Sequence, residues 1–297
     1  MNAVWIDDLV LRRAEHLVRS PASITREGMR YEQIEGAVLR VRTGGRGPHT
    51  IVFVPDPPNV IEHYDRLFDL LAPHLRIVCL ELPGFGLSFP RGRFDPSFSN
   101  GIATLARALD HLGTGPCVLA LSCVAGLLSL ALARDRPDLV SKIVLVQTPS
   151  WPEEIAWSRR VDSGNLLGRP IVGQLLMAFG RRRVATGWYK AATPDRETAG
   201  RFDAVAQERF DHGAGYCLAS AFQAIRREPV PDFGVLPQDA LVLWGMADRT
   251  HRRTDKRSPL RCFPGARVIE LEGVGHFPDL ERPEWFRDRL LEFLGMS

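Results

Sequence analysis

The chain has 297 residues, of which 45% are hydrophobic and 25% charged, and its formal net charge at pH 7 is +3. These are the proportions of a globular protein, and they exclude a chain that is largely disordered. The small net charge argues against nucleic acid as a partner, because proteins that bind nucleic acid concentrate positive charge on one surface.

The N-terminal region predicts a helix and no signal peptide. Hydrophobic residues recur at helical spacing from Trp5 to Leu17, with Asp7 and Asp8 among them, and Pro21 follows. The longest apolar run, residues 124–133, is too short to cross a bilayer. The five cysteines show no metal-binding spacing. We therefore expect a cytoplasmic protein with reduced thiols, no metal and no membrane partner.

Short, continuously hydrophobic runs predict the strands of a sheet that is buried on both faces. They lie at residues 37–41, 51–54, 77–80, 117–120, 143–146, 240–244 and 267–271. Segments with helical spacing lie at residues 63–71, 102–112, 124–133 and 283–294. This alternation predicts an α/β protein with a mostly parallel, doubly wound sheet and helices on both sides.

The alternation stops between residues 147 and 235, where the chain is helix-like and rich in arginine and aromatic residues. We interpret this stretch as a helical cap inserted into the sheet domain. The chain then divides into an N-terminal part of the core (residues 1–146), the cap (residues 147–235) and a C-terminal part of the core (residues 236–297).

A candidate nucleophile stands between the strand at 117–120 and the helix at 124–133, in the sequence Leu121-Ser122-Cys123-Val124-Ala125-Gly126. A strand–turn–helix junction holds one side chain above the sheet, provided that the neighbouring residues are small. The N-terminus of the following helix points its amides at that side chain, which favours a thiolate and an oxyanion.

The junction resembles the nucleophile elbow of the α/β-hydrolase superfamily, whose pattern is Gly-x-nucleophile-x-Gly-Gly with a helix that ends before His-Pro or Arg-Pro. Ala125 and Gly126 match the two small positions, and Arg136-Pro137 match the helix end. The resemblance therefore makes Cys123 the nucleophile.

Two alternatives stay open at this junction. Ser122 is the competing nucleophile, although that choice would place the β-branched Val124 where the turn needs a small residue. Leu121 stands where the family usually has glycine. In the second alternative Cys123 is a buried core thiol in a degenerate elbow.

Two further motifs follow in the superfamily's order of nucleophile, acid and base. Trp244-Gly245-Met246-Ala247-Asp248 resembles the family's acid loop, which implies that Asp248 orients an imidazole. Gly273-Val274-Gly275-His276-Phe277-Pro278 resembles its histidine loop, which implies that His276 is the base. The loop Pro83-Gly84-Phe85-Gly86-Leu87-Ser88 matches another family signature, which we interpret as structural.

The loop after the strand at 51–54 departs from the family pattern His-Gly-x-Pro, whose third residue usually donates a backbone N–H to the oxyanion. Aligning Pro58 with the family proline puts Pro57 at that position, and proline has no N–H. Asp56 is either a turn residue or an acid or base that acts on the substrate. Val124 supplies the other expected amide, and Asn59 is a candidate substitute donor.

The resemblance implies a cysteine acyl-enzyme mechanism on an ester, lactone or thioester. The enzyme would be an esterase, thioesterase or acyltransferase with a small-molecule acyl substrate, free or bound to a carrier protein. We expect no organic cofactor, because the chain has neither a dinucleotide fingerprint nor a phosphate loop. The predicted substrate contacts are Asp56, Pro57, Ser122, Trp151 and Trp188.

Two other classes of function stay open. The missing oxyanion donor favours a non-hydrolytic enzyme that catalyses elimination or cyclisation, for example in natural-product tailoring. The departures at Leu121 and Pro57 favour a catalytically inactive binding protein. The cluster Arg181–Arg183 is either a solvated face or a docking surface for an acidic carrier protein.

Overall fold

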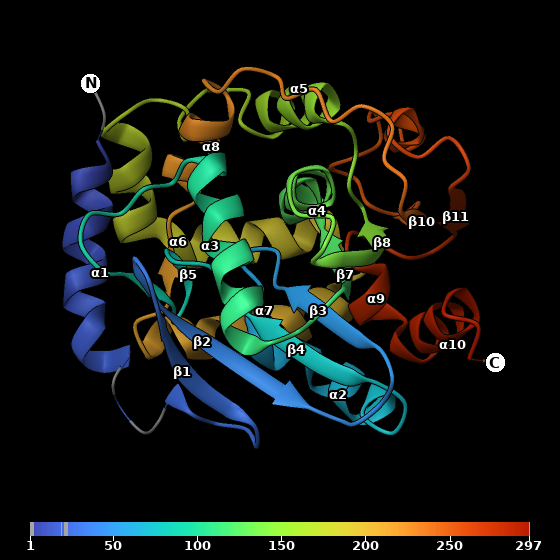
Figure 1. Ribbon diagram of the computed structural model, residues 1–297. Helices are drawn as coiled ribbons and strands as arrows, with labels where there is room; N and C mark the ends of the chain where they lie inside the picture. Colours follow the sequence, from blue (N-terminus) through green and yellow to red (C-terminus); the bar gives the residue numbers. More distant parts are fainter. Residues whose placement is uncertain (1–2, 19, 21–22, 297) are drawn as a thin grey trace.

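The computed structural model describes residues 3–18, 20 and 23–296, and its centre is a twisted sheet of nine strands (Figure 1). Eight of them follow the order β1-β2-β4-β3-β7-β8-β10-β11, and β6 pairs with β2. The bounds are β1 Met29–Ile34, β2 Ala37–Gly44, β3 Thr50–Val54, β4 Arg76–Leu80, β6 Phe89–Pro90, β7 Cys117–Ser122, β8 Val140–Val146, β10 Asp239–Gly245 and β11 Arg267–Leu271. All pairs from β4 to β11 are parallel, whereas β2 is antiparallel to β1, β4 and β6.

Helices cover both faces of the sheet. Side chains on successive strand residues point to opposite faces, so a continuously hydrophobic strand gives the sheet two hydrophobic faces that must be buried. Along β3, Ile51 and Phe53 belong to one hydrophobic core, and Val52 and Val54 to the other. The first core includes α2 (Asp65–Leu71) and α10 (Pro283–Phe293), and the second includes α3 (Phe98–Leu112) and α4 (Cys123–Asp135). The predicted parallel, doubly wound sheet is therefore confirmed.

The strands that the sequence pattern missed lie at the edges of the structure. β1 mixes hydrophobic with polar residues, of which only Met29 and Ile34 are buried, and it pairs only with β2 among the described strands, so it lacks a continuous hydrophobic run. The two-residue strands β5 (Phe85–Gly86), β6 and β9 (Gly215–Tyr216) are too short to produce any periodicity. The predicted N-terminal helix is α1 (Val4–Val18), which packs against α6 (Val172–Ala192).

The chain between β8 and β10 forms an inserted segment of helices. It holds α5 (Trp151–Val161), α6, α7 (Arg196–Asp211), β9 and α8 (Leu218–Ile225). β9 pairs with β5, and this small second sheet joins the inserted segment to the Pro-Gly-x-Gly loop. A Cβ at Gly86 would lie 2.0 Å from the carboxyl carbon of Glu81, which explains why this loop requires glycine there.

A buried ion cluster also joins the inserted segment to the sheet. Arg40 of β2 pairs with Glu62 of η2 (Ile61–Tyr64) and, at 3.2 Å, with Glu81. Arg209 of α7 pairs with the same Glu62 at 3.3 Å. Glu81 also accepts backbone hydrogen bonds from Ile61 and Leu87. Two arginines from separate parts of the chain thus share one buried carboxylate.

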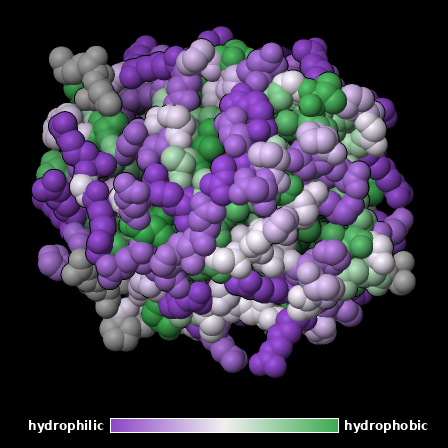
Figure 2. Space-filling view, in the orientation of Figure 1, coloured by the Kyte–Doolittle hydropathy of each residue, from purple (hydrophilic) through white to green (hydrophobic). Residues whose placement is uncertain are grey.

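The surface shown in Figure 2 carries hydrophilic side chains over most of its area, with hydrophobic residues in small groups between them. Among the helices of the described residues, none is both long and apolar enough to span a bilayer.

Candidate active site

The loops that carry the predicted site residues all follow the carboxyl ends of strands. Asp56 follows β3, Cys123 follows β7, Asp248 follows β10 and His276 follows β11. In a parallel sheet these ends lie along one edge, which is where α/β proteins place their ligand sites. The fold therefore brings together residues that are far apart in the sequence.

Cys123 occupies the turn between β7 and α4 and has φ of 51°, in the left-handed region that a non-glycine residue rarely adopts. The turn is tight, since a Cβ at Gly126 would lie 2.0 Å from Oγ1 of Thr148. Such conformations persist only where the surrounding structure enforces them, and they are frequent at active sites. The backbone strain at Cys123 therefore favours this residue as the functional one of the elbow.

Ser122, the competing candidate, lies in extended backbone at the end of β7, with φ of −110°. Its side chain is buried, and Ser122 is absent from the lining of the cavity described below. The structure thus gives Ser122 neither the position of a nucleophile nor that of a substrate contact, because strand side chains point alternately to opposite faces.

The predicted acid and base form a buried pair. His276 Nδ1 donates a hydrogen bond to Asp248 Oδ2 at 2.7 Å. Gln147 Nε2 donates to the same oxygen at 3.0 Å, and the amide and hydroxyl of Thr250 both donate to Asp248 Oδ1 at 2.8 Å. Burial alone would raise the pKa of Asp248, but the contact with His276 outweighs it and lowers that pKa. Asp248 is therefore a fixed, charged acceptor that holds one tautomer of the imidazole.

Close backbone packing positions the two loops. A Cβ at Gly245 would lie 1.7 Å from the carbonyl oxygen of Gly275, so the acid loop requires glycine at this point. Glu281 accepts hydrogen bonds from the amides of Gly275 and Phe277, at 2.8 and 3.1 Å. These contacts explain the Trp-Gly motif and the glutamate that follows the histidine loop.

The other nitrogen of His276 faces Asp56. Nε2 lies 3.3 Å from Asp56 Oδ2, and both side chains are buried. Burial opposes a charged imidazole, yet Asp248 and Asp56 together raise the pKa of His276 to about 10. Burial also raises the pKa of Asp56, although His276 lowers it in part. Asp56 and His276 therefore titrate as a coupled buried pair, in which the raised pKa of His276 favours the charged imidazole at neutral pH.

The thiol of Cys123 has acidic neighbours. Its Sγ donates a long hydrogen bond, 3.9 Å, to Oε1 of Glu154 in the first turn of α5. Burial, and then Asp56 and Glu154, raise the pKa of the thiol well above its usual value, while the Val124 amide lowers it. Burial and the charge of Asp56 raise the pKa of Glu154 to about 8. At rest the thiol and the Glu154 carboxyl are thus both protonated at neutral pH.

The loop after β3 has the departure that the sequence predicted. Pro57 borders the cavity and offers no N–H. Asn59 does not line the cavity: its side-chain oxygen accepts a hydrogen bond from Tyr189, and its buried side-chain nitrogen has no partner among the described residues, so it is not placed as a substitute donor at the cavity wall. Asp56 both forms the turn, where its carbonyl accepts a hydrogen bond from the Asn59 amide at 2.9 Å, and directs its carboxyl group to the cavity and to His276.

A cavity of about 460 Å³ opens above Cys123, with Asp56 and Pro57 on one side. Its other walls are mainly apolar and include Trp188 and Phe222 of the inserted segment. Trp151, the other predicted aromatic contact, does not line it. Trp151 is buried against Phe98, with ring centroids 4.6 Å apart, because it starts α5 on the side of the sheet core.

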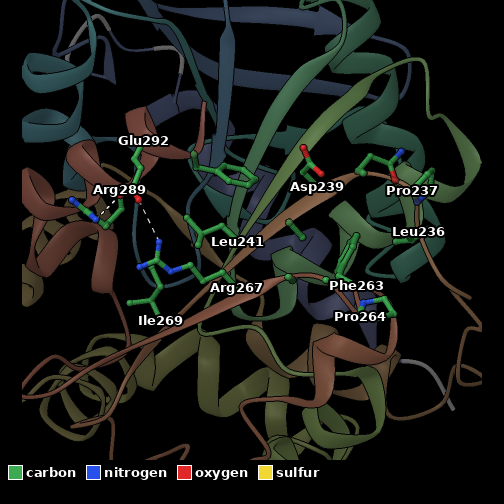
Figure 3. A pocket seen from close by; sticks show the side chains of 15 residues that line it. Leu236, Pro237, Asp239, Leu241, Phe263, Pro264, Arg267, Ile269, Arg289 and Glu292 are labelled. Atoms are coloured by element: carbon green, nitrogen blue, oxygen red, sulfur yellow. Dashed lines mark hydrogen bonds and ion pairs between the residues drawn. The ribbon is translucent and has the colours of Figure 1, made fainter. Parts of the chain in front are cut away.

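A second cavity, of about 520 Å³, lies at the opposite end of the sheet (Figure 3). Asp239 and Arg267, the first residues of β10 and β11, line it, and Arg267 pairs with Glu292. Because the nucleophile, acid and base lie at the carboxyl ends of the strands, this cavity is not part of the candidate active site.

Three residues beside the site were not predicted. Gln147 directly follows β8, has φ of 50°, and forms hydrogen bonds with both Asp248 and the amide of Gly245. Glu154 resembles any acidic residue in a first helical turn. His251 stacks on Trp157 at 4.8 Å between ring centroids, and burial lowers its pKa to about 3. Two signals in the sequence could have identified two of these residues. Gln147 stands just after a predicted strand, and His251 stands three residues after Asp248.

Comparisons with known proteins agree with this geometry. Residues 51–289 match the alpha/beta hydrolase family. The chain is 30% identical over 258 residues to the uncharacterised hydrolase YugF of Bacillus subtilis, covering 84% of this chain and 90% of that protein. It is 25% identical over 245 residues to haloalkane dehalogenase 2 of Mycobacterium tuberculosis, covering 78% and 83%. A thermophilic esterase from Thermogutta terrifontis shares the fold with a TM-score of 0.70 at 20% identity, over 89% of this chain and 98% of that one. The chain therefore belongs to the alpha/beta hydrolase family.

Proposed function

We propose that this protein is an acyl-transfer enzyme in which Cys123 attacks the carbonyl carbon of an ester, lactone or thioester. The observation that carries the proposal is the position of Cys123. Its backbone has a strained φ, and its thiol borders a mainly apolar cavity beside the hydrogen-bonded pair His276–Asp248. The sulfur and a ring nitrogen of His276 lie within 4.8 Å of each other. Catalytic hydrogen bonds are often this long without substrate and shorten when the substrate binds.

The contact between His276 and Asp56 gives the mechanism its starting step. The proton on Nε2 of His276 first passes to Asp56, 3.3 Å away, and Nε2 is then free to take the proton of the Cys123 thiol. The resulting thiolate adds to the carbonyl, and the leaving group departs with the proton from His276. Water or a substrate nucleophile then gives its proton to His276, displaces the sulfur and restores the thiol.

A protonated Asp56 could also replace the oxyanion donor that is missing because Pro57 has no backbone N–H. A neutral carboxyl group donates a hydrogen bond and does not repel the developing oxyanion, as other apolar sites that keep a carboxylic acid neutral show. Together with the amide of Val124 it makes a pair of donors, so Asp56 becomes the substitute oxyanion donor. The 3.3 Å contact with His276 keeps this carboxyl group at the cavity wall.

The cavity favours a small, largely apolar acyl substrate. A volume of about 460 Å³ is within the usual range for small-molecule sites. Within the cluster Arg181–Arg183, Arg182 pairs with Asp211 and the Arg181 guanidinium lies 5.8 Å from the Phe210 ring, so two of the three side chains are engaged inside the molecule. A free small molecule is therefore a better-supported substrate than one bound to a carrier protein. The similar proteins include a haloalkane dehalogenase and an esterase, whose names imply different substrates, so the comparisons do not identify the substrate class further.

The test is trapping of the acyl-enzyme. Folded protein is incubated with activated thioesters and p-nitrophenyl esters of several chain lengths, quenched early and analysed by intact and peptide mass spectrometry. We expect an adduct on Cys123 that disappears in Cys123→Ala and forms slowly in His276→Ala. Cys262→Ala, which removes a half-buried thiol elsewhere, is the matched control and should load normally. Full activity of Cys123→Ala on a substrate that the wild type turns over would disprove the proposal.

A second candidate is an elimination or cyclisation that uses acid–base chemistry without a covalent intermediate. The observation in its favour is the direct contact of His276 Nε2 with Asp56 rather than with the thiol. In this reaction the pair takes a proton from one substrate atom and returns it to another. Product mass separates the candidates, because hydrolysis adds the mass of water and elimination or cyclisation does not.

A further inference from the structure

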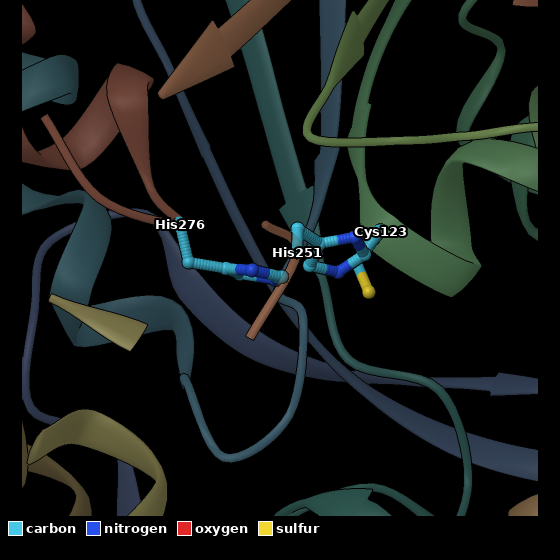
Figure 4. A group of neighbouring side chains, drawn as sticks. All are labelled: Cys123, His251 and His276. Carbon is cyan, nitrogen blue, oxygen red and sulfur yellow. The ribbon is translucent and has the colours of Figure 1, made fainter. Parts of the chain in front are cut away.

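The thiol of Cys123 and the imidazoles of His251 and His276 form a cluster that the proposed acyl transfer uses only in part (Figure 4). The sulfur and one nitrogen from each histidine all lie within 4.8 Å of one another, and all three residues are buried. They come from three segments, namely the start of α4 and the loops after β10 and β11. No sequence spacing could reveal such a cluster, which explains why no metal site was expected.

Each imidazole of the cluster is oriented by a partner on its other nitrogen. Asp248 holds Nδ1 of His276 at 2.7 Å, and the hydroxyl of Thr254 lies 3.2 Å from Nδ1 of His251. Nε2 of His251 is buried and has no hydrogen-bond partner among the described residues. An oxygen on the remote nitrogen is the usual support of a metal-binding histidine, because it fixes the tautomer and leaves the other nitrogen as the ligand.

The surroundings of the cluster are acidic. Asp56 Oδ2 lies 3.3 Å from Nε2 of His276, and Glu154 Oε1 lies 3.9 Å from the sulfur. Asp248 adds a third buried carboxylate behind His276. Buried acidic groups in such numbers are costly unless protons or a cation neutralise them, so the cluster favours a positively charged ligand.

We propose that Cys123, His251 and His276 form a binding site for a soft divalent cation such as Zn²⁺, and that its occupation blocks acyl transfer. Thiolate sulfur and imidazole nitrogen are preferred zinc ligands, and a fourth position stays open toward Asp56. Tetrahedral zinc places such ligand atoms about 3.3–3.6 Å apart, so side-chain movements of roughly 1 Å complete the site.

The chemistry of occupation follows from the ligands. The Cys123 thiol loses its proton to the solvent and donates a sulfur lone pair to the metal. The proton on Nε2 of His276 passes to Asp56, so that both imidazoles bind in their neutral form. The bound sulfur can no longer attack a carbonyl, and His276 can no longer accept a proton. This inhibitory consequence rests on the proposed acyl transfer, whereas the binding itself does not.

The binding test is calorimetric titration of the whole, chelator-treated protein with Zn²⁺ in two buffers of different ionisation enthalpy. We expect one Zn²⁺ per chain and the release of about one proton. Cys123→Ser and His251→Gln should each weaken binding by about 100-fold or more, because loss of a ligand exceeds the effect of its supporting partner. Cys262→Ser and His111→Gln, which change a cysteine and a histidine outside the cluster, should bind like the wild type.

Replacing Zn²⁺ by Co²⁺ adds a spectroscopic readout, since a thiolate–Co²⁺ absorption band should form with the wild type and be absent from Cys123→Ser. Thermal unfolding reports whether each variant is folded. If one of the two cluster variants is not folded, the affinity of the other cluster variant tests the inference. No saturable binding to the wild type, or binding as tight as that of the wild type in both cluster variants, would overturn the inference. Acyl loading of Cys123 in chelator is measured in parallel. Loading without Zn²⁺ binding refutes only the metal site, and Zn²⁺ binding without loading refutes only the acyl transfer.

Discussion

The two sides of the nucleophile differ in how closely they follow the family pattern. On one side, Asp248 and His276 have the expected sequence, the expected contact at 2.7 Å and a set of supporting hydrogen bonds. On the other side, the β3 loop replaces an amide donor by Pro57 and adds the acidic Asp56. In the proposed mechanism, proton transfer through His276 follows the family pattern, and the stabilisation of negative charge departs from it. We therefore propose that the β3 loop determines how this site differs from other members of the family.

The largest effect should come from the side that follows the pattern. Asp248→Asn keeps the shape of the side chain but offers an amide N–H or a neutral oxygen to His276 Nδ1, which removes the acceptor that fixes the tautomer. We expect the rate of Cys123 acylation to fall by about 10³- to 10⁴-fold. Asp239→Asn, at the opposite end of β10, is the matched control. Rapid-quench mass spectrometry measures both, and an unchanged rate in Asp248→Asn would mean that His276 is not the base.

The next effect separates the two candidate reactions at Asp56. Asparagine retains a hydrogen-bond donor without a negative charge, whereas alanine retains neither. If Asp56 donates to the oxyanion, Asp56→Asn should acylate within about tenfold of the wild type and Asp56→Ala should lose about 100-fold. If Asp56 instead exchanges protons with the substrate, both variants should lose turnover. Product formation and adduct formation are measured on the same samples.

A third prediction concerns stability on the side of the base. Gly245→Ala would force a Cβ against the carbonyl of Gly275, with 1.7 Å between them before relaxation. We expect the free energy of unfolding to fall by about 2 kcal/mol or more, because both contacting groups are fixed in the backbone. Gly265→Ala, where a Cβ meets open space, is the control. Denaturant unfolding compares the two, and equal stability would show that the acid and histidine loops are less tightly packed.

The smallest effect should appear as a pH dependence. The pKa of Glu154 is about 8 in the folded protein and is raised from 4.5, so wild-type stability associated with this group is present below about pH 4.5 and lost as pH rises through 8. Glutamine does not titrate. The melting temperature of Glu154→Gln should match that of the wild type near pH 5 and exceed it by a few degrees at pH 9. Glu153→Gln is the control, and a difference that does not vary with pH would contradict the assignment.

Much of the fold could be predicted because most strands of the sheet are hydrophobic and buried on both faces. The seven predicted strands correspond to β2, β3, β4, β7, β8, β10 and β11, and the loops after four of them hold the predicted site residues. β1 was missed because polar residues interrupt its hydrophobic ones, and only Met29 and Ile34 at its two ends are buried. β11 lies at the other margin of the sheet and is only partly buried, yet Val268, Ile269 and Leu271 made it recognisable. The hydrophobic run of a strand, rather than its place in the sheet, therefore decided whether it was predicted.

The site could be predicted only where a loop motif identifies a residue. Asp248 and His276 stand in such motifs, and their contact was expected from them. Glu154 and His251 reach Cys123 through the packing of α5 and of the acid loop, which no local pattern records. For the same reason Trp151 and Trp188 looked equivalent in the sequence, yet one packs into the core and the other borders the cavity.

The ion cluster beneath the inserted segment has a consequence for engineering. Glu62 is shared by Arg40 of the sheet and Arg209 of α7, so the inserted segment supplies part of the charge balance of the core. Deleting the segment, or exchanging it for that of a relative, would leave Glu62 with one arginine fewer, and breaking a buried pair of this kind typically costs about 3–5 kcal/mol. A chimera with a new substrate range must therefore carry a replacement cation for Glu62, in addition to a new cavity wall.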